Sequence, residues 1–401
     1  MRLANSLAHE AIRTGRVDRG PVLQPFHRLH GDRLRSGLGI VRPSDQNGLG
    51  RCRDRAEYDA ALVRAHALEA AQFNEIITFD RRGRLLSSFG STGEGPGEFL
   101  QIWWAAPYRG DSIAVWDVRN VVSIFTPRGE FGRSARLPIL PRSLSGIPGG
   151  TSPWGLGVYP DGSFLVAPGG VADSGDPGVR WFNDYLLRVE PDGTAWDTLG
   201  TFGVSQFSWD GERVSAVPFK LIGQRALRGE QLVFGTGERW EIGVYDPGGS
   251  LAQSIRRSAA LPEATDVDME QWRQWHVSQY ESGPEGSSRL AELARERAMR
   301  IEGPPSKPAF SYLLVDSEGN IWAENYRWVY DAIPPDPRPA TWSVFDPSGE
   351  WLGDVEVSER LLLRTVGSDY AIGYYVDDYD AKHLQVYALE KPEAWDSAPS
   401  P

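Results

Sequence analysis

The sequence predicts an all-β protein, a six-bladed β-propeller with a short helical insertion and an atypical N-terminal segment. A short apolar run, ending in an aromatic residue or Val and followed by a turn and a Gly, recurs along the 401-residue chain. The chain also holds 15 Trp and 44 Gly residues. Large aromatic side chains suit half-buried sheet surfaces, and Gly suits tight turns. A ring of repeated four-stranded sheets satisfies both observations.

Each copy of the repeat reads as a strand, a short turn and the start of a second strand. The five copies are ITFDRRG (77–83), SIFTPRG (123–129), LRVEPDG (187–193), GVYDPGG (243–249) and SVFDPSG (343–349), and LQVYALE (384–390) closes the series without the Gly. This pattern is typical of β-hairpins. A turn and an apolar strand, such as RGDSIAVWD (109–117), precede most copies. With one more strand in front, each unit makes a four-stranded blade.

The spacing of the copies predicts where the propeller is interrupted. Blades run about 40–50 residues, whereas the aromatic residues of the fourth and fifth copies, Tyr245 and Phe345, lie 100 positions apart. Residues 266–300 lack strand alternation and are rich in Glu, Arg, Gln and Ala. We expect two short helices here, separated at SGPEGSS (282–288), in an insert that covers about 262–305.

The string GSTGEGPGEF (90–99) has the Gly content of a phosphate-binding loop but not its chemistry. Such a loop needs Lys and Ser or Thr to reach phosphate and magnesium, whereas this string carries Glu94 and Glu98, which repel phosphate. Pro96 and the flanking strands exclude the helix that a dinucleotide loop opens. We therefore expect a connection from the outer strand of one blade to the inner strand of the next, with Phe99 packed between the blades.

Charge divides the chain into two compositions. Residues 1–71 hold 12 Arg and eight acidic residues, which leaves 30 basic and 46 acidic residues, net −16, in 72–401. An acidic body repels nucleic acid and anionic membranes, and no apolar run is long enough for a transmembrane span. We expect 1–71 to be a poorly ordered or partly helical Arg-rich segment, 72–392 to be the propeller and 393–401 to be a disordered tail.

Several strings resemble a known propeller family. GSTGEGPGEF followed by GDSIAVWDVRNVVSIF resembles the NHL-repeat pattern, and LLVDSEGNIWAE, VFDPSGEWLGDV and DDYDAKHLQVYALEKP resemble strands of six-bladed, NHL-repeat-like propellers of soil bacteria such as Gemmatimonadota and Acidobacteria. The resemblance covers residues 74–392. Members usually begin with an export signal, so it implies a periplasmic or cell-surface protein. No signal peptide is visible at the written start, and we expect 1–71 to be an altered or mispredicted start.

Few residues in the propeller region could carry catalysis. Cys52 is the single Cys, and only His276 and His383 fall within the propeller, so a zinc site with three or four N or S ligands is disfavoured. Carboxylates and amides at strand ends could hold calcium, as in lactonase-type propellers. The candidates are Asp117, Asn120, Asn183, Asp184, Glu324, Asn325, Asp377 and Asp378. The same residue types also form ordinary turns.

Aromatic residues near the predicted loops are the other candidates. Six could line a rim that stacks on sugar rings or grips a peptide: Trp103, Trp104, Trp322, Tyr326, Trp328 and Tyr330. The alternative is packing between blades. We favour a non-catalytic, monomeric binding scaffold without a cofactor, which presents one face to a protein, peptide or glycan. The second reading is a calcium-dependent hydrolase or lyase of the lactonase-like type, with its site in the central channel.

Overall fold

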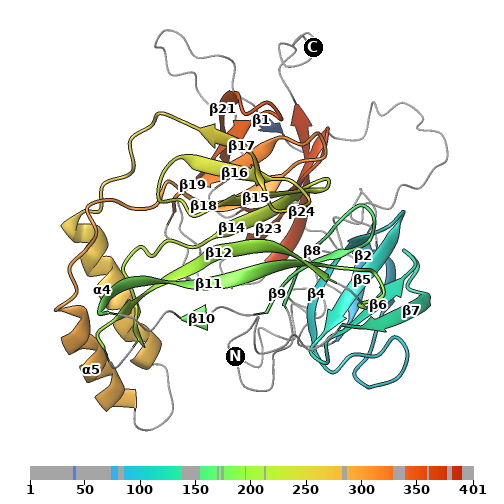
Figure 1. The fold of residues 1–401 in the computed structure, drawn as a ribbon, viewed down its shortest axis with the longest axis horizontal. Coiled ribbons are helices and arrows are strands. Elements are labelled where there is room, and N and C mark those ends of the chain that lie inside the picture. Colours follow the sequence, from blue (N-terminus) through green and yellow to red (C-terminus); the bar gives the residue numbers. More distant parts are fainter. Residues whose placement is uncertain are drawn as a thin grey trace.

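In the computed structural model, the described residues form six antiparallel sheets and two helices (Figure 1). The residues described are 39–41, 74–79, 85–137, 154–168, 171–172, 176–194, 196–211, 214–281, 287–327, 339–358, 361–376 and 382–390. This architecture confirms the all-β prediction and fits a β-propeller. Among these residues, neither helix is long and apolar enough to span a bilayer.

We number the sheets in chain order. Sheet 1 holds β2 (Ile76–Phe79) and β3 (Leu85–Phe89). Sheet 2 holds β4 (Ile102–Tyr108), β5 (Ser112–Asp117), β6 (Val121–Phe125) and β7 (Phe131–Arg136). Sheet 3 holds β8 (Trp154–Val158), β9 (Phe164–Ala167), β11 (Gly178–Val189) and β12 (Trp196–Trp209), with β10 (Val171–Ala172) on β11 and β13 (Val214–Ser215) on β12.

The other three sheets follow the same order. Sheet 4 holds β14 (Gln224–Arg228), β15 (Gln231–Gly235), β16 (Glu241–Tyr245) and β17 (Leu251–Arg256). Sheet 5 holds β18 (Phe310–Val315), β19 (Ile321–Asn325), β20 (Ala340–Phe345) and β21 (Trp351–Val357). Sheet 6 holds β22 (Leu361–Val366), β23 (Tyr370–Val376) and β24 (Lys382–Glu390), and β1 (Gly39–Val41) pairs with β24 at its outer edge.

The first strands of sheets 2 to 6 lie side by side in chain order. β4 contacts β8, β8 contacts β14, β14 contacts β18 and β18 contacts β22. Buried apolar clusters fill the spaces between neighbouring sheets, such as the cluster that joins Trp116 of sheet 2 to Phe164 of sheet 3. The inner edges of the sheets therefore meet one another, as sheets arranged around a common axis do.

The recurring Gly of the sequence has one structural role. Gly129, Gly249 and Gly349 have φ values of 84°, 82° and 89°, which only Gly adopts at little cost. Each donates its N–H to the carbonyl three residues earlier at 2.9 Å. The strand register shifts at the aromatic residue just before each of these turns. The repeat is thus a hairpin that connects the third strand of a sheet to the fourth, with one extra residue beside the turn.

The Gly-rich connection joins sheets 1 and 2. Phe99 is fully buried and its ring centroid lies 5.9 Å from that of Phe125 in sheet 2. Asn74 donates to Thr92 Oγ1 at 3.0 Å and to the Leu100 carbonyl at 2.9 Å, and its Oδ1 accepts the Ile102 N–H at 3.1 Å. As predicted, residues 90–99 connect β3 to β4, and Phe99 is buried in the cluster that joins sheets 1 and 2.

Helices α4 (Asp266–Glu281) and α5 (Ser287–Ala298) occupy the segment between sheets 4 and 5 in which helices were predicted. Figure 1 shows them side by side at one end of the long β11–β12 hairpin. Met269 and Trp272 of α4 and Ala298 of α5 form a separate core with Phe219, and Tyr326 packs against it. The helices therefore pack against the segments that follow β13 and β19.

A capping box starts helix α4. Asp268 accepts hydrogen bonds from the Thr265 N–H at 2.9 Å and hydroxyl at 2.7 Å, and the Asp268 N–H donates back to Thr265 Oγ1 at 3.2 Å. Lys307, just before sheet 5, also donates to Asp268, at 2.8 Å. Burial acts to raise the pKa of Asp268, but the bonds from Lys307 and Thr265 outweigh it and lower the pKa to about 2.

Asp268→Asn tests this anchor by its pH dependence. The folded-state pKa lies below the ordinary value of 3.8, so the carboxylate stabilises the fold above about pH 4 and loses that contribution as the pH falls towards 2. We expect the variant to lose about 1 kcal/mol at pH 7, because the partly exposed pair is screened. Urea unfolding from pH 7 to 2 should show the two curves converging below pH 4. A gap that stays constant with pH contradicts the assignment.

Candidate ligand-binding site

The four predicted aromatic residues that the structure describes do not share one surface. Trp103 and Trp104 are half-buried on β4 and pack against the core between sheets 2 and 3. Trp322 is fully buried in sheet 5, and its Nε1 donates to Asp316 Oδ2 at 3.1 Å. Tyr326 is half-buried beside the helical core. Trp328 and Tyr330 lie outside the described residues.

The predicted metal ligand Asp117 is engaged by the chain itself. Its carboxylate, 1% exposed, accepts the Leu100 N–H at 2.7 Å, the Arg119 N–H at 2.6 Å and the Arg119 Nε at 2.8 Å. It therefore holds the Gly-rich connection against the end of β5. Asn120 follows with a φ of 62° and donates to the Leu137 carbonyl at 2.9 Å, which is the role of a turn-forming residue.

Four other predicted ligands lie in sheets 3 and 5. Glu324 is buried, accepts from Ser311 Oγ at 2.9 Å and forms an ion pair with Arg327 at 2.7 Å. Asn325 Oδ1 accepts from Ser343 Oγ at 2.8 Å.

Asp184 is buried next to Asn183 on β11. Burial lowers the pKa of Arg225 on β14, and the negative charge of Asp184 opposes that change. Asp377 and Asp378 lie outside the described residues.

Within the part of the chain that the structure describes, these groups form no cluster of three or more His, Cys, Asp or Glu side chains. His276 stacks on Trp272 in α4, with ring centroids 5.0 Å apart, and burial lowers its pKa. The side chain of His383 is outside the described part.

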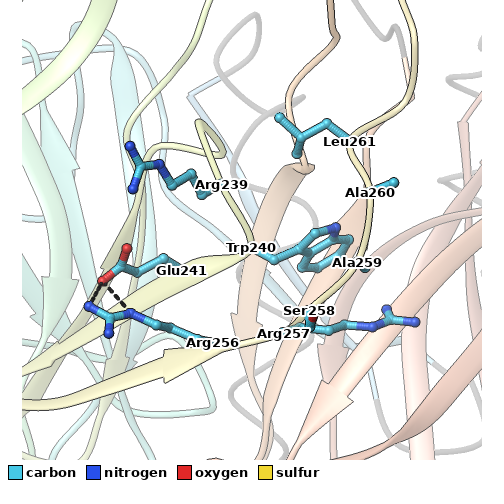
Figure 2. A pocket seen from close by; sticks show the side chains of 9 residues that line it. All are labelled: Arg239, Trp240, Glu241, Arg256, Arg257, Ser258, Ala259, Ala260 and Leu261. Carbon is cyan, nitrogen blue, oxygen red and sulfur yellow. Dashed lines mark hydrogen bonds and ion pairs between the residues drawn. The ribbon is translucent and has the colours of Figure 1, made fainter.

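A pocket of about 750 Å³ opens at the edge of sheet 4 (Figure 2). It lies where β16 begins and β17 ends, before the chain continues to helix α4. Its lining combines three arginines, one carboxylate and a largely apolar wall: Arg239, Trp240, Glu241, Arg256, Arg257, Ser258, Ala259, Ala260 and Leu261. In the antiparallel pairing of β16 with β17, Glu241 stands opposite Arg256.

The pleat sorts the pocket side chains by face. Figure 2 shows Arg239, Glu241 and Arg256 on one side of the hairpin and Trp240 and Arg257 on the other, as successive residues of a strand alternate. The first group is polar and accessible. Trp240 and Arg257, the second group, pack towards sheet 5 and form the largely buried wall of the pocket.

Arg257 joins sheet 4 to sheet 5. Its guanidinium carbon lies 5.2 Å from the Trp240 ring centroid and 4.3 Å from that of Trp351 in sheet 5. It donates to Ser343 Oγ at 2.6 Å and to both carboxylate oxygens of Asp354, at 3.1 and 3.2 Å. Because these partners occupy the guanidinium, Arg257 supports the pocket rather than offering its charge to a ligand.

Arg239 and Arg256 supply the accessible positive charge. The side chain of Arg256 is 71% exposed and pairs with the partly exposed Glu241 at 2.7 Å. The Arg256 hydrogen bond is the main cause of the lowered pKa of Glu241. Arg239 is exposed and makes no hydrogen bond or ion pair with any described residue. An exposed ion pair contributes little stability, so Arg256 can exchange Glu241 for a ligand carboxylate at small cost.

One feature of the sequence locates part of this pocket. The repeat copy at 243–249 fixes a hairpin, and counting outwards from its turn places the RWE string at 239–241 beside Arg256 and Arg257. The pairing of Glu241 with Arg256 therefore followed from the turn. The stacking of Arg257 on Trp351 did not, because it depends on how sheet 5 packs against sheet 4.

Comparisons with known proteins show likeness of fold only. No protein-family model and no curated protein sequence matches the chain. A member of the DUF4221 family from Bacteroides vulgatus is 12% identical, with 79% of this chain and 85% of that chain covered and a TM-score of 0.41. Regucalcin, a calcium-binding protein from Agrobacterium tumefaciens, is 9% identical over 80% and 85%, with a TM-score of 0.36. BamB from Moraxella catarrhalis is 9% identical over 79% of each chain, with a TM-score of 0.31.

Proposed function

We propose that this chain is a non-catalytic binding protein that holds a negatively charged segment of a protein, peptide or glycan in the pocket of sheet 4. The exposed guanidinium of Arg239, which makes no hydrogen bond or ion pair with any described residue, carries the proposal. It stands beside the exchangeable Arg256–Glu241 pair and the buried Trp240. Guanidinium groups bind carboxylate, sulfate and phosphate groups with paired hydrogen bonds, and the apolar wall covers the rest of the ligand.

The proposal includes a six-bladed propeller closed by β1. The six sheets, of which sheets 2 to 6 have adjoining first strands, support six blades. The antiparallel pairing of β1 with β24, and its contact with β21, support closure of sheet 6 by an N-terminal strand. A closed ring gives the pocket a rigid frame, because each sheet is held on both faces.

Two observations support binding rather than catalysis. The carboxylates of Asp117 and Glu324 are taken up by Arg and Ser donors of the chain itself. The accessible charge of the pocket is positive and comes from arginine, which keeps its proton and does not serve as a general base. The extracytoplasmic location and the aromatic contacts of Trp103, Trp104 and Tyr326 remain predictions, from the resemblance and the sequence respectively.

Titration with two acidic ligands tests the function. We propose to measure the affinity of a Glu-rich peptide and of an oligogalacturonate for the full chain at low and high salt. We expect one of them to bind, with an affinity that falls as salt rises. Arg239→Gln should weaken binding about fivefold to tenfold. Arg297→Gln, which removes an exposed arginine of helix α5, is the matched control. Binding of neither ligand, or equal loss in both variants, overturns the proposal.

A further inference from the structure

β17 offers an open strand edge beside the pocket. It is the outermost strand of sheet 4, and among the described residues it pairs with β16 alone. Its outward-facing N–H and C=O groups are therefore free to pair with another extended chain. Leu251, at its start, is 57% exposed, which adds an apolar contact to the same edge.

The side chains of β17 define what would pair with it. Arg256 shares its face with Ser254, whose Oγ donates to Glu241 Oε1 at 3.0 Å, and Figure 2 places Arg239 on that same side. In an antiparallel or parallel ladder, the residue opposite Arg256 projects to the same face within reach of its guanidinium. An acidic residue at that position would meet Arg256 directly, with Glu241 and Arg239 on the β16 side of Arg256.

The open strand edge favours a peptide over a glycan as the ligand. A strand edge presents donors and acceptors in regular alternation, and a peptide backbone in extended form satisfies them with a matching ladder. A glycan offers hydroxyls without that period. A peptide strand added along β17 would also reach the pocket, because Arg256, the last residue of β17, lines it.

The geometry points to an extended acidic peptide as the ligand: it adds as a fifth strand along β17 and places a carboxylate on Arg256, next to the pocket that Arg239 also lines. This inference rests on the proposed function and names its ligand class. The peptide alternates acidic residues, which face the arginines, with apolar residues on the opposite face. Its affinity arises from the backbone ladder, and its specificity arises from the acidic residue opposite Arg256.

Backbone methylation tests the ladder. The ligands are a peptide of about six residues that alternates Glu and Val, and the same peptide with N-methyl groups on the alternate residues whose N–H groups would face β17. Methylation removes those donors but keeps every charge. We expect the methylated peptide to bind at least about tenfold more weakly. Arg256→Gln should weaken the unmethylated peptide about fivefold, and Arg297→Gln should leave its affinity unchanged within about twofold.

Different results would overturn the strand addition alone or the strand addition together with the charged pocket. Equal affinity for the methylated and unmethylated peptides overturns the strand addition and leaves a charged pocket in place. Binding of the oligogalacturonate but not of the peptide also overturns it, and assigns the pocket to a glycan. Binding of neither the peptide nor the oligogalacturonate overturns the proposed function together with this inference. Circular dichroism of each variant confirms that the sheets are retained.

Discussion

We expect Phe99→Ala to lower the free energy of unfolding by about 3–5 kcal/mol, the usual cost of removing a buried Phe side chain. Phe99 is fully buried in a cluster that also holds Ile76 of sheet 1 and Ile102 and Phe125 of sheet 2. The change therefore opens a cavity where two sheets meet. Urea denaturation, followed by Trp fluorescence, measures the difference against the unchanged protein.

Leu100→Ala is the matched control, because it removes an adjacent apolar side chain that is 44% exposed. Exposed positions usually change stability by about 0.5 kcal/mol or less. A similar effect of both substitutions would contradict the role of Phe99 as an anchor and would assign the stability of the joint to its backbone. In that case the hydrogen bonds of Asn74 and Asp117 would carry it.

The sequence was sufficient for those parts of the fold that local chemistry determines. The turns at Gly129, Gly249 and Gly349 need a positive φ, and few residues other than Gly adopt it readily, so their hairpins appear as a repeat. Helices α4 and α5 lie in a long segment of the propeller region that lacks strand alternation. The absence of Lys from GSTGEGPGEF excluded a phosphate loop for the same reason: the chemistry needs particular residues at particular places.

Features that depend on distant segments could not be predicted. β11 and β12 extend over 12 and 14 residues, although Gly/Pro-rich strings flank the first of them. β1 pairs with β24 from the opposite end of the chain, and it comes from the Arg-rich segment that lacked strand alternation. Trp322 and Tyr326 are four positions apart, yet one is in the core of sheet 5 and the other is beside the helices.

In the pocket of sheet 4, the sequence likewise does not show which arginine of the dipeptide Arg256–Arg257 is buried. The two residues have identical side chains, so composition and spacing treat them alike. Alternation along the strand sends them to opposite faces. Arg256 is 71% exposed and Arg257 is 19% exposed, because sheet 5 covers only the second face.

We expect Arg257→Met to lower the free energy of unfolding by about 2–4 kcal/mol, the cost of breaking a largely buried charged network. The Met side chain replaces the apolar stem, but Ser343 and Asp354 lose the guanidinium that donates to them at 2.6 and 3.1 Å. Trp240 and Trp351 also lose the Arg257 guanidinium that lies over their rings, and with it the cation–π attraction. Thermal and urea unfolding measure the change.

Arg256→Met supplies the comparison, because it deletes the same charge one residue earlier. Its exposed pair with Glu241 is worth about 0–1 kcal/mol, so the fold should be almost unaffected, while binding of the Glu–Val peptide should weaken. Arg257→Met should show the reverse order, with stability lost first and binding lost through the displaced wall of the pocket. Equal destabilisation by the two variants would contradict the division of the dipeptide into a binding arginine and a supporting arginine.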